Sequence, residues 1–308
     1  MSSLAFLDLG TNTFQLLIVK IIDNAPVLVF EESIAVKLGE GGIEKGYISK
    51  PAFDRGLSAL KQFKRSIDLY QVKPIRAAAT SALRTAGNGA EFLEKIRCET
   101  GIIPEIITGD REAELIYQGV RAAINMTDEK CLILDIGGGS VEFIICNKVE
   151  VFWKRSYDIG AARLMEQFHH SDPISEADIN NLNKYLETTL SLLKTQIEIH
   201  KPELLIGSSG AFESFAALID SRFKVSFENP EIKIELNDFA EVSELILKSS
   251  HKERSGNPAI IPVRVDMIVM ATLLTKYVLN QFALKTLKLS TYSLKEGLLF
   301  EHLQESSF

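Results

Sequence analysis

Two short acidic, glycine-containing segments of this chain could bind an anion together with a metal ion. They are LDLGTNT, residues 7–13, and LDIGGGS, residues 134–140. Glycine and small polar residues let a tight turn direct successive backbone N–H groups into one concavity, which suits a phosphate. A carboxylate beside a phosphate would repel it unless a divalent cation lay between them. We therefore expect a phosphate site that uses Mg²⁺.

The two segments align residue by residue, which indicates a duplication. Asp8 matches Asp135 and Gln15 matches Glu142. One such segment alone could be only a glycine-rich hairpin, but two copies suggest turns that face each other across a cleft between related lobes. The predicted metal ligands of the two turns are Asp8 and Asp135. The predicted phosphate-binding residues of the two turns are Gly10, Thr11, Asn12, Thr13, Gly137, Gly138, Gly139 and Ser140.

A third loop, IGSSGAFESF from Ile206, has the pattern of a strand, a small-residue turn and a helix start. Backbone N–H groups at a helix start can bind a further anionic group, so Ser208, Ser209 and Gly210 are also predicted to bind phosphate. The alternative is that glycine and serine serve only the geometry of the turn.

Two further segments offer a base and an arginine. In ITGDREAELIYQGV, residues 107–120, Asp110 is the expected N-cap of a helix, so Glu112 lies in the first turn, where the helix dipole favours an ionised carboxylate. Glu112 could then accept a proton, or it could only stabilise the helix. In ATSALRTAGN, residues 79–88, Arg84 presents a planar group suited to phosphate oxygens, unless it is a solvated loop residue.

The composition excludes several classes of protein. The formal net charge of -7 disfavours a surface that coats nucleic acid, and no apolar run approaches the ~20 residues of a membrane span. The start MSSLAFLDLG has no basic region typical of a secretory signal, so we expect a cytoplasmic protein. The three cysteines are unclustered and the five histidines lack metal-ligand spacing, which indicates neither a disulfide framework nor a zinc site.

The elements that must position these residues alternate between strands and helices, which predicts an α/β architecture. Residues 38–46 are expected to form a flexible glycine-rich loop. Expected strands are 4–9, 14–22, 27–38, 75–79, 102–107, 131–136, 141–146, 149–157 and 286–290. Expected helices are 51–70, with Ser49 as its N-cap, 90–99, one from 110, 161–168, 176–199, 265–281 and one from 295.

Seven motifs, in order, resemble the exopolyphosphatase and guanosine pentaphosphate phosphatase family. They are LDLGTNTFQLLIV, LGEGGIEKG, ATSALRTAGN, ITGDREAELIYQGV, ILDIGGGSVEF, IGSSGAF and LSTYSLKEGLL. The resemblance implies a two-lobed, actin-like, ribonuclease H-like fold with the active site between the lobes. It implies an N-terminal lobe over 1–125, rejoined by a C-terminal helix over about 298–308, and a C-terminal lobe over 126–297.

The resemblance also implies a reaction, namely hydrolysis of the terminal phosphate of polyphosphate or of the 5′ γ-phosphate of pppGpp, with Mg²⁺. The family's general base corresponds to Glu112 and its important arginine to Arg84. Its second-loop carboxylates correspond to Asp135 and Glu142, so Glu142 is also predicted to bind the metal, and family members are often homodimers. The chain departs from the family pattern at Arg111, at Thr108 and in the segment IPVRVD, residues 261–266. It also lacks the extra helical domain of longer members, which puts processivity in doubt. The alternatives are a kinase of the same fold and a sensor that binds without cleaving.

Overall fold

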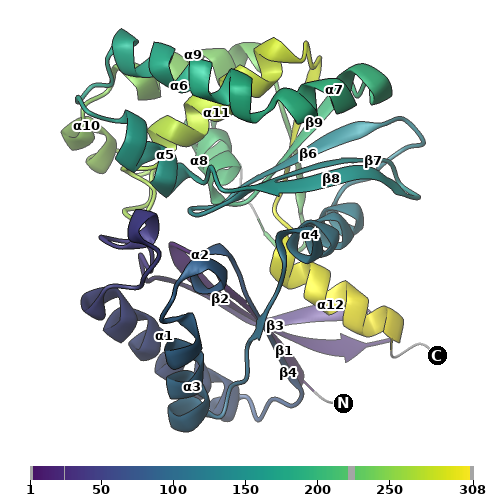
Figure 1. Cartoon of the computed structure of the whole chain (residues 1–308). Helices are drawn as coiled ribbons and strands as arrows, with labels where there is room; N and C mark the ends of the chain where they lie inside the picture. Colours follow the sequence, from purple (N-terminus) through teal and green to yellow (C-terminus); the bar gives the residue numbers. More distant parts are fainter. Residues whose placement is uncertain (1–2, 24, 221–225, 306–308) are drawn as a thin grey trace.

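The computed structural model describes residues 3–23, 25–220 and 226–305, which form two lobes (Figure 1). Each lobe contains one mixed β-sheet with helices packed on it. Both sheets share a plan in which three antiparallel strands are followed by strands that join in parallel, and the C-terminal sheet adds one antiparallel edge strand. The fold is therefore the two-lobed, actin-like α/β fold that was expected, with a duplicated core.

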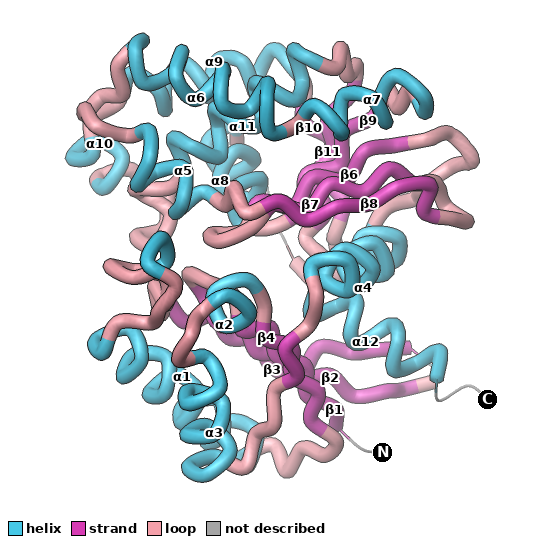
Figure 2. Tube along the Cα trace, viewed as in Figure 1, coloured by secondary structure: helices cyan, strands magenta, loops and turns pink. Residues whose placement is uncertain are grey.

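The N-terminal sheet has the strand order β3-β2-β1-β4-β5. Its strands are β1 (Ser3–Leu9), β2 (Thr13–Ile22), β3 (Ala25–Ala35), β4 (Ile75–Ala79) and β5 (Glu105–Ile106). Its helices are η1 (Ile43–Lys45), α1 (Lys50–Leu69), α2 (Ser81–Thr85) and α3 (Gly89–Thr100). Helices α1 and α3 lie together on one face of this sheet, as the tube in Figure 2 shows.

The C-terminal sheet has the strand order β10-β11-β9-β6-β7-β8. Its strands are β6 (Cys131–Ile136), β7 (Val141–Cys146), β8 (Val151–Tyr157), β9 (Leu204–Ser208), β10 (Glu231–Ile234) and β11 (Thr286–Ser290). Its helices are α5 (Ala161–Phe168), α6 (Glu176–Thr189), α7 (Ser191–His200), α8 (Gly210–Ile219), α9 (Leu236–Lys248), α10 (His251–Ser255) and α11 (Ile268–Gln281). Helices α6, α7 and α9 lie on the side of the sheet that points away from the N-terminal lobe, whereas α5 and α8 lie nearer the N-terminal lobe (Figure 1).

Two helices, α4 (Gly109–Ala123) and α12 (Leu294–Glu305), lie between the two sheets (Figure 1). Helix α4 packs on β7, β8 and α12, while α12 packs on β1 and β2. Their apolar side chains join residues of both sheets in one cluster, which includes Phe6, Ile133 and Leu299. The lobes therefore share a third core at this end of the molecule.

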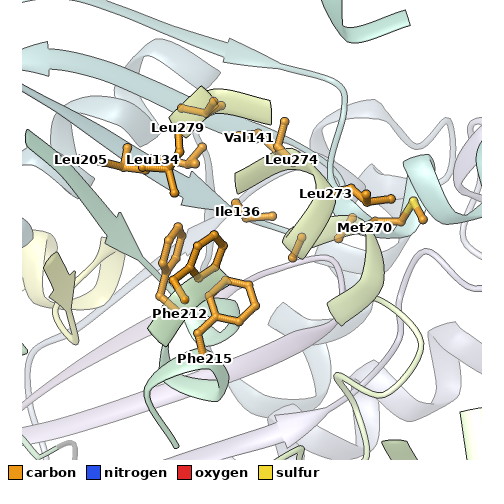
Figure 3. Packing of buried hydrophobic residues seen from close by; sticks show 14 of the residues in the cluster. Leu134, Ile136, Val141, Leu205, Phe212, Phe215, Met270, Leu273, Leu274 and Leu279 are labelled. Carbon is orange, nitrogen blue, oxygen red and sulfur yellow. The ribbon is translucent and has the colours of Figure 1, made fainter. Parts of the chain in front are cut away.

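Strands β6 and β7 are buried along their whole length, because α4 covers one face and the C-terminal helices cover the other. A strand buried on both faces has a continuous apolar sequence, as LILDI and VEFII do apart from their acids. In Figure 3, Phe212 and Phe215 of α8 pack beside Ile136 at the end of β6. The carboxylates that interrupt these strands, Asp135 and Glu142, are thus buried at the end of the strands where the two sheets face each other.

Most expected elements are present, with several differences. The cap of α4 is Thr108, whose hydroxyl accepts a hydrogen bond from the Arg111 amide, so the prediction of Asp110 as N-cap was wrong. The expected helix 176–199 is divided at Leu190, and the expected strand 102–107 is reduced to β5. Residues 38–46 form η1 and a hydrogen-bonded turn instead of a flexible loop.

No helix in the described ranges is long and apolar enough to cross a membrane. The predicted domain boundaries at 125 and 297 stay a prediction. Helix α12, near the end of the described chain, contacts α4, β1 and β2.

Candidate active site

The two predicted turns have the same backbone geometry. In the first, the Gly10 amide donates to the Thr13 carbonyl at 3.1 Å, and in the second the Gly137 amide donates to the Ser140 carbonyl at 3.0 Å. A Cβ atom on either glycine would lie 2.9 Å from that carbonyl oxygen, so both positions require glycine. The alignment of the two segments therefore corresponds to a repeated structure.

The two turns also touch each other. A Cβ atom on Gly139 would lie 2.6 Å from Oγ1 of Thr11 and 2.5 Å from Oγ of Ser81, and one on Gly138 would collide with the Asn12 amide. Both turns line one cavity of about 400 Å³, together with Asp8, Asp135, Glu112 and Glu142. Asp8 and Asp135 thus share a groove between the lobes.

Asp135 is oriented by two serines. Its Oδ2 accepts hydrogen bonds from Oγ of Ser208 at 2.6 Å and from Oγ of Ser293 at 2.5 Å. Ser208 is fully buried and does not line the cavity, so its hydroxyl supports Asp135 instead of facing a ligand. Burial raises the pKa of Asp135, and the two serine hydroxyls oppose that rise because they stabilise the ionised form.

Asp8 and Glu142 complete a group of buried acids. Burial raises the pKa of Asp8, and repulsion by Glu112 and Asp135 raises it further. The pKa of Glu142 is raised by the same causes, although Ser156 donates to its Oε1 at 2.6 Å. Oδ1 of Asp8 is buried and has no hydrogen-bond partner among the described residues. A buried acid with an unpaired oxygen, among others of the same charge, fits a site that binds a cation.

A small cation with phosphate ligands matches this donor set better than a cation held by protein alone. Within the described ranges, no three His, Cys, Asp or Glu side chains converge closely enough to hold a metal ion. Mg²⁺ usually binds one or two carboxylates, several waters and substrate phosphates, so it does not need such a cage. The residues present therefore fit Mg²⁺ that arrives with a phosphorylated ligand.

Glu112 lies on the cavity wall and is held by Arg84. Nη1 of Arg84 donates to Oε2 of Glu112 at 2.8 Å and to the Ile107 carbonyl at 3.1 Å. Burial raises the pKa of Glu112 to about 7, while the Arg84 guanidinium lowers it. Arg84 itself lines a smaller neighbouring hollow with Ser156 and Asp158, and not the main cavity.

The third loop adjoins the second turn, because Ser208 pairs with Asp135 where β9 lies parallel to β6. Ser209 has a φ of 75°, an uncommon backbone conformation for a residue with a side chain, and its Oγ donates to the Ile136 carbonyl at 3.0 Å. Ser209 and Gly210 line the cavity at the start of α8. Two of the three predicted residues of this loop therefore face the cleft.

Two matching turns, with four acids around one interlobe cavity, agree with the family to which the sequence is similar. Residues 17–306 match the Ppx/GppA phosphatase family. The chain belongs to this family. The match begins within β2, after the first turn, and it covers the second turn and α12.

Two individual proteins are similar in sequence over 90% or more of this chain. Exopolyphosphatase 1 of Mycobacterium leprae is 26% identical over 306 residues, which cover 99% of this chain and 90% of that protein. A bifunctional 3-dehydroquinate synthase/phosphatase of Fusobacterium nucleatum is 30% identical over 292 residues, which cover 90% of this chain and 43% of that protein.

Solved Ppx/GppA structures are similar as well. The crystal structure of an exopolyphosphatase from Cytophaga hutchinsonii has a TM-score of 0.96 and 40% identity, and the match covers 99% of this chain and 98% of that one. The Ppx/GppA protein of Aquifex aeolicus has a TM-score of 0.83 and 25% identity, with coverage of 100% and 99%.

Arg111, where this Ppx/GppA sequence departs from the family pattern, points away from the cavity. Its guanidinium Nη2 lies 2.6 Å and 2.5 Å from the two carboxylate oxygens of Glu301 on α12. Nη1 lies 3.4 Å from Oε2 of Glu114. Arg111 therefore links α4 to α12 and leaves the cleft to Glu112.

The side chains of the site that were not predicted include Ser156, Arg264, Ser293 and Lys295. Ser293 and Lys295 lie in the motif LSTYSLKEGLL, so the resemblance could have indicated them. Nothing in the spacing of Ser156 or Arg264 relates them to the turns. They reach the site only because β8 lies beside β7 and because residues 261–267 return to the cleft.

Proposed function

We propose that this protein hydrolyses phosphoanhydride bonds, releasing the terminal phosphate of inorganic polyphosphate or the 5′ γ-phosphate of pppGpp. The observation that carries the proposal is the contact of the two matching turns around one cavity, with Glu112 on its wall. Membership of the Ppx/GppA family and the similarity to exopolyphosphatases support it.

The turns would bind the end of the phosphate chain. In this proposal, backbone N–H groups of residues 11–13 and 137–140, with those of Ser209 and Gly210, hold the phosphate oxygens. Of Asp8, Asp135 and Glu142, one or two would bind Mg²⁺ directly and the rest through its waters, and the ion would neutralise phosphate charge and polarise the bond to be broken. Ser208 and Ser293 would keep Asp135 in position by their hydrogen bonds, and Ser156 would do the same for Glu142.

Glu112 would orient the attacking water and accept its proton. A general base works best when its pKa lies near the working pH, and burial raises the pKa of Glu112 to about 7. Arg84 would fix the direction of the carboxylate through its 2.8 Å contact. We also propose that Arg84 stabilises the charge of the phosphoryl group during transfer.

The test measures phosphate release from long polyphosphate, tripolyphosphate and pppGpp with Mg²⁺ and no acceptor. Glu112→Gln should lower kcat by ~10²–10⁴-fold, the usual contribution of a general base. The matched control Glu241→Gln removes an exposed carboxylate on α9 and should leave kcat unchanged.

Three outcomes of this test would contradict the proposal. Activity that depends on an added acceptor would indicate a kinase, and binding without product would indicate a sensor. Near-normal turnover by Glu112→Gln would exclude the assigned base. Chelation of Mg²⁺ by EDTA should abolish phosphate release from every substrate. Addition of excess Mg²⁺ should then restore the rate.

A further inference from the structure

The cleft is unusually acidic for a site that would bind a polyanion. Among the described side chains that line it, seven carboxylates face two basic groups, Arg264 and Lys295. Four of the acids, Asp8, Glu112, Asp135 and Glu142, are the ones to which the proposed function assigns a role. The remaining three, Glu31, Glu213 and Glu296, have no such role and bear on which substrate can enter.

Both basic groups of the cleft are already paired with these three acids. Nζ of Lys295 lies 2.7 Å from Oε1 of Glu296 and 3.2 Å from Oε1 of Glu31. Nη2 of Arg264 lies 2.7 Å from Oε2 of Glu213. A phosphate chain that passes these groups would therefore meet no free cation, because Arg264 and Glu213 form a neutral pair and Lys295 lies between two carboxylates.

The Arg264–Glu213 pair lies directly beside the third loop. A Cβ atom on Gly210 would lie 2.3–2.5 Å from the Arg264 guanidinium, which shows that this group packs against the loop backbone. Nη1 of Arg264 also lies 3.2 Å from Oγ of Ser214. The guanidinium is thus fixed next to the predicted phosphate-binding amides, with Glu213 as its counter-ion.

The segment that carries Arg264 forms a wall across both lobes. It includes IPVRVD, where the sequence departs from the family pattern. Met267, which follows this segment, accepts a hydrogen bond from Nδ2 of Asn12 in the first turn. Oδ2 of Asp266 lies 3.6 Å from Nζ of Lys37. The cavity-lining residues Ile261 and Val263 of this segment are apolar. This wall offers an extended phosphate chain little to bind except Arg264.

We propose that Glu213 is a specificity-determining residue that disfavours long phosphate chains by neutralising Arg264. The inference rests on the proposed function, because it concerns the chain length of the same substrate. A short chain is held by the turns and its metal ion, whereas a long chain carries further charges past the third loop. Those charges meet the Glu213 carboxylate, and like charges at close range repel.

The test compares long-chain polyphosphate with tripolyphosphate. Glu213→Gln keeps the size of the side chain and frees the charge of Arg264. The ratio of kcat/KM for the long chain to kcat/KM for tripolyphosphate should rise roughly tenfold, which is the effect expected of one charge contact at a partly exposed site. The change should come mainly from a lower KM for the long chain. Arg264→Gln, which leaves Glu213 without its cation, should lower this ratio.

The exposed control Glu241→Gln changes the net charge equally and should leave the ratio unchanged. An unchanged ratio in Glu213→Gln, or an equal rise in the control, would overturn the inference. Calorimetric binding of both chains to the wild type and to Glu213→Gln gives the same comparison without turnover. If the wild type binds both chains but releases no phosphate, the proposed function fails while the inference is still decided.

Discussion

At the scale of single residues, the feature that matters most is the opposition of two effects on Glu112. Its burial favours the protonated carboxyl, whereas Arg84 favours the carboxylate. Burial is the larger cause, so the pKa of Glu112 rises to about 7. A carboxylate with this pKa can both accept a proton from water and release it to solvent near neutral pH.

This pKa predicts the pH dependence of the reaction. The base must be ionised to act, so kcat/KM should fall about tenfold for each pH unit below about 7 and level off above it. The measurement is a kcat/KM profile for tripolyphosphate at constant free Mg²⁺. The residual activity of Glu112→Gln should lack this inflection. A wild-type profile that is flat from about pH 6 to about pH 8 would contradict the assignment.

Residue roles could be predicted only where a motif carries them. Asp8, Asp135 and Glu142 follow from two matching turns, and the structure brings them to one cavity. Ser208 was predicted as a phosphate ligand, but it is buried and supports Asp135, because β9 pairs with β6 at that residue. The pairing of Arg264 with Glu213 joins segments 51 positions apart, and no spacing rule indicates it.

At the scale of elements, the contact between the two turns depends on glycine. Gly139→Ala would place a methyl group 2.5 Å from Oγ of Ser81 and 2.6 Å from Oγ1 of Thr11. Excess volume in a packed region lowers the free energy of unfolding by about 1–3 kcal/mol, so the Tm should fall. Because the added group forces the two turns apart, KM should rise as well.

A glycine with room for a side chain provides the control for this prediction. In Gly256→Ala the nearest atom, the Lys252 carbonyl oxygen, would lie 3.5 Å away, which is an ordinary contact. Its Tm and KM should both match the wild type. If Gly139→Ala bound substrate as well as Gly256→Ala does, the closeness of the turns would be unimportant for binding.

Elements with strong periodicity were predicted well and others were not. The three-and-four spacing over 51–70 corresponds to α1, and the apolar runs at 131–136 and 141–146 correspond to β6 and β7. The break at Leu190 could not be predicted, because apolar residues continue through it on the buried face of α6 and α7. The predicted N-cap of α4 was two residues too late, because Thr108 and Asp110 are both good capping residues.

At the scale of the whole molecule, α4 and α12 connect the lobes, and Arg111 with Glu301 is part of that connection. Arg111→Glu would bring a new carboxylate close to Glu301 and Glu114, so like charges would replace an ion pair. The expected loss of stability is about 1 kcal/mol, since the pair is partly exposed.

The reversed pair Arg111→Glu with Glu301→Arg should recover much of this loss. The measurement is a double-mutant cycle from thermal or urea unfolding. Additive losses in the double variant would show that the two side chains do not interact. Phosphate release by the double variant should stay near the wild-type value, because Arg111 points away from the cleft.

The two-lobed arrangement itself was predictable, because the duplication of the turns implies duplicated sheets. The way in which the lobes meet was not. The shared core of Phe6, Ile133 and Leu299 joins residues from both sheets and α12, and each segment alone has only an ordinary apolar pattern.

That shared core has a mechanical consequence. It closes one end of the molecule with packed apolar side chains, whereas the contacts across the cleft are individual polar ones, such as those of Asn12 with Met267, Lys37 with Asp266 and Arg163 with Glu44. Polar ties exchange readily with water, but a dry core cannot open without a large loss of burial. We therefore expect the two lobes to rotate relative to each other about a hinge at the shared core, so that the largest displacement occurs at the opposite side of the cleft, near residues 261–267.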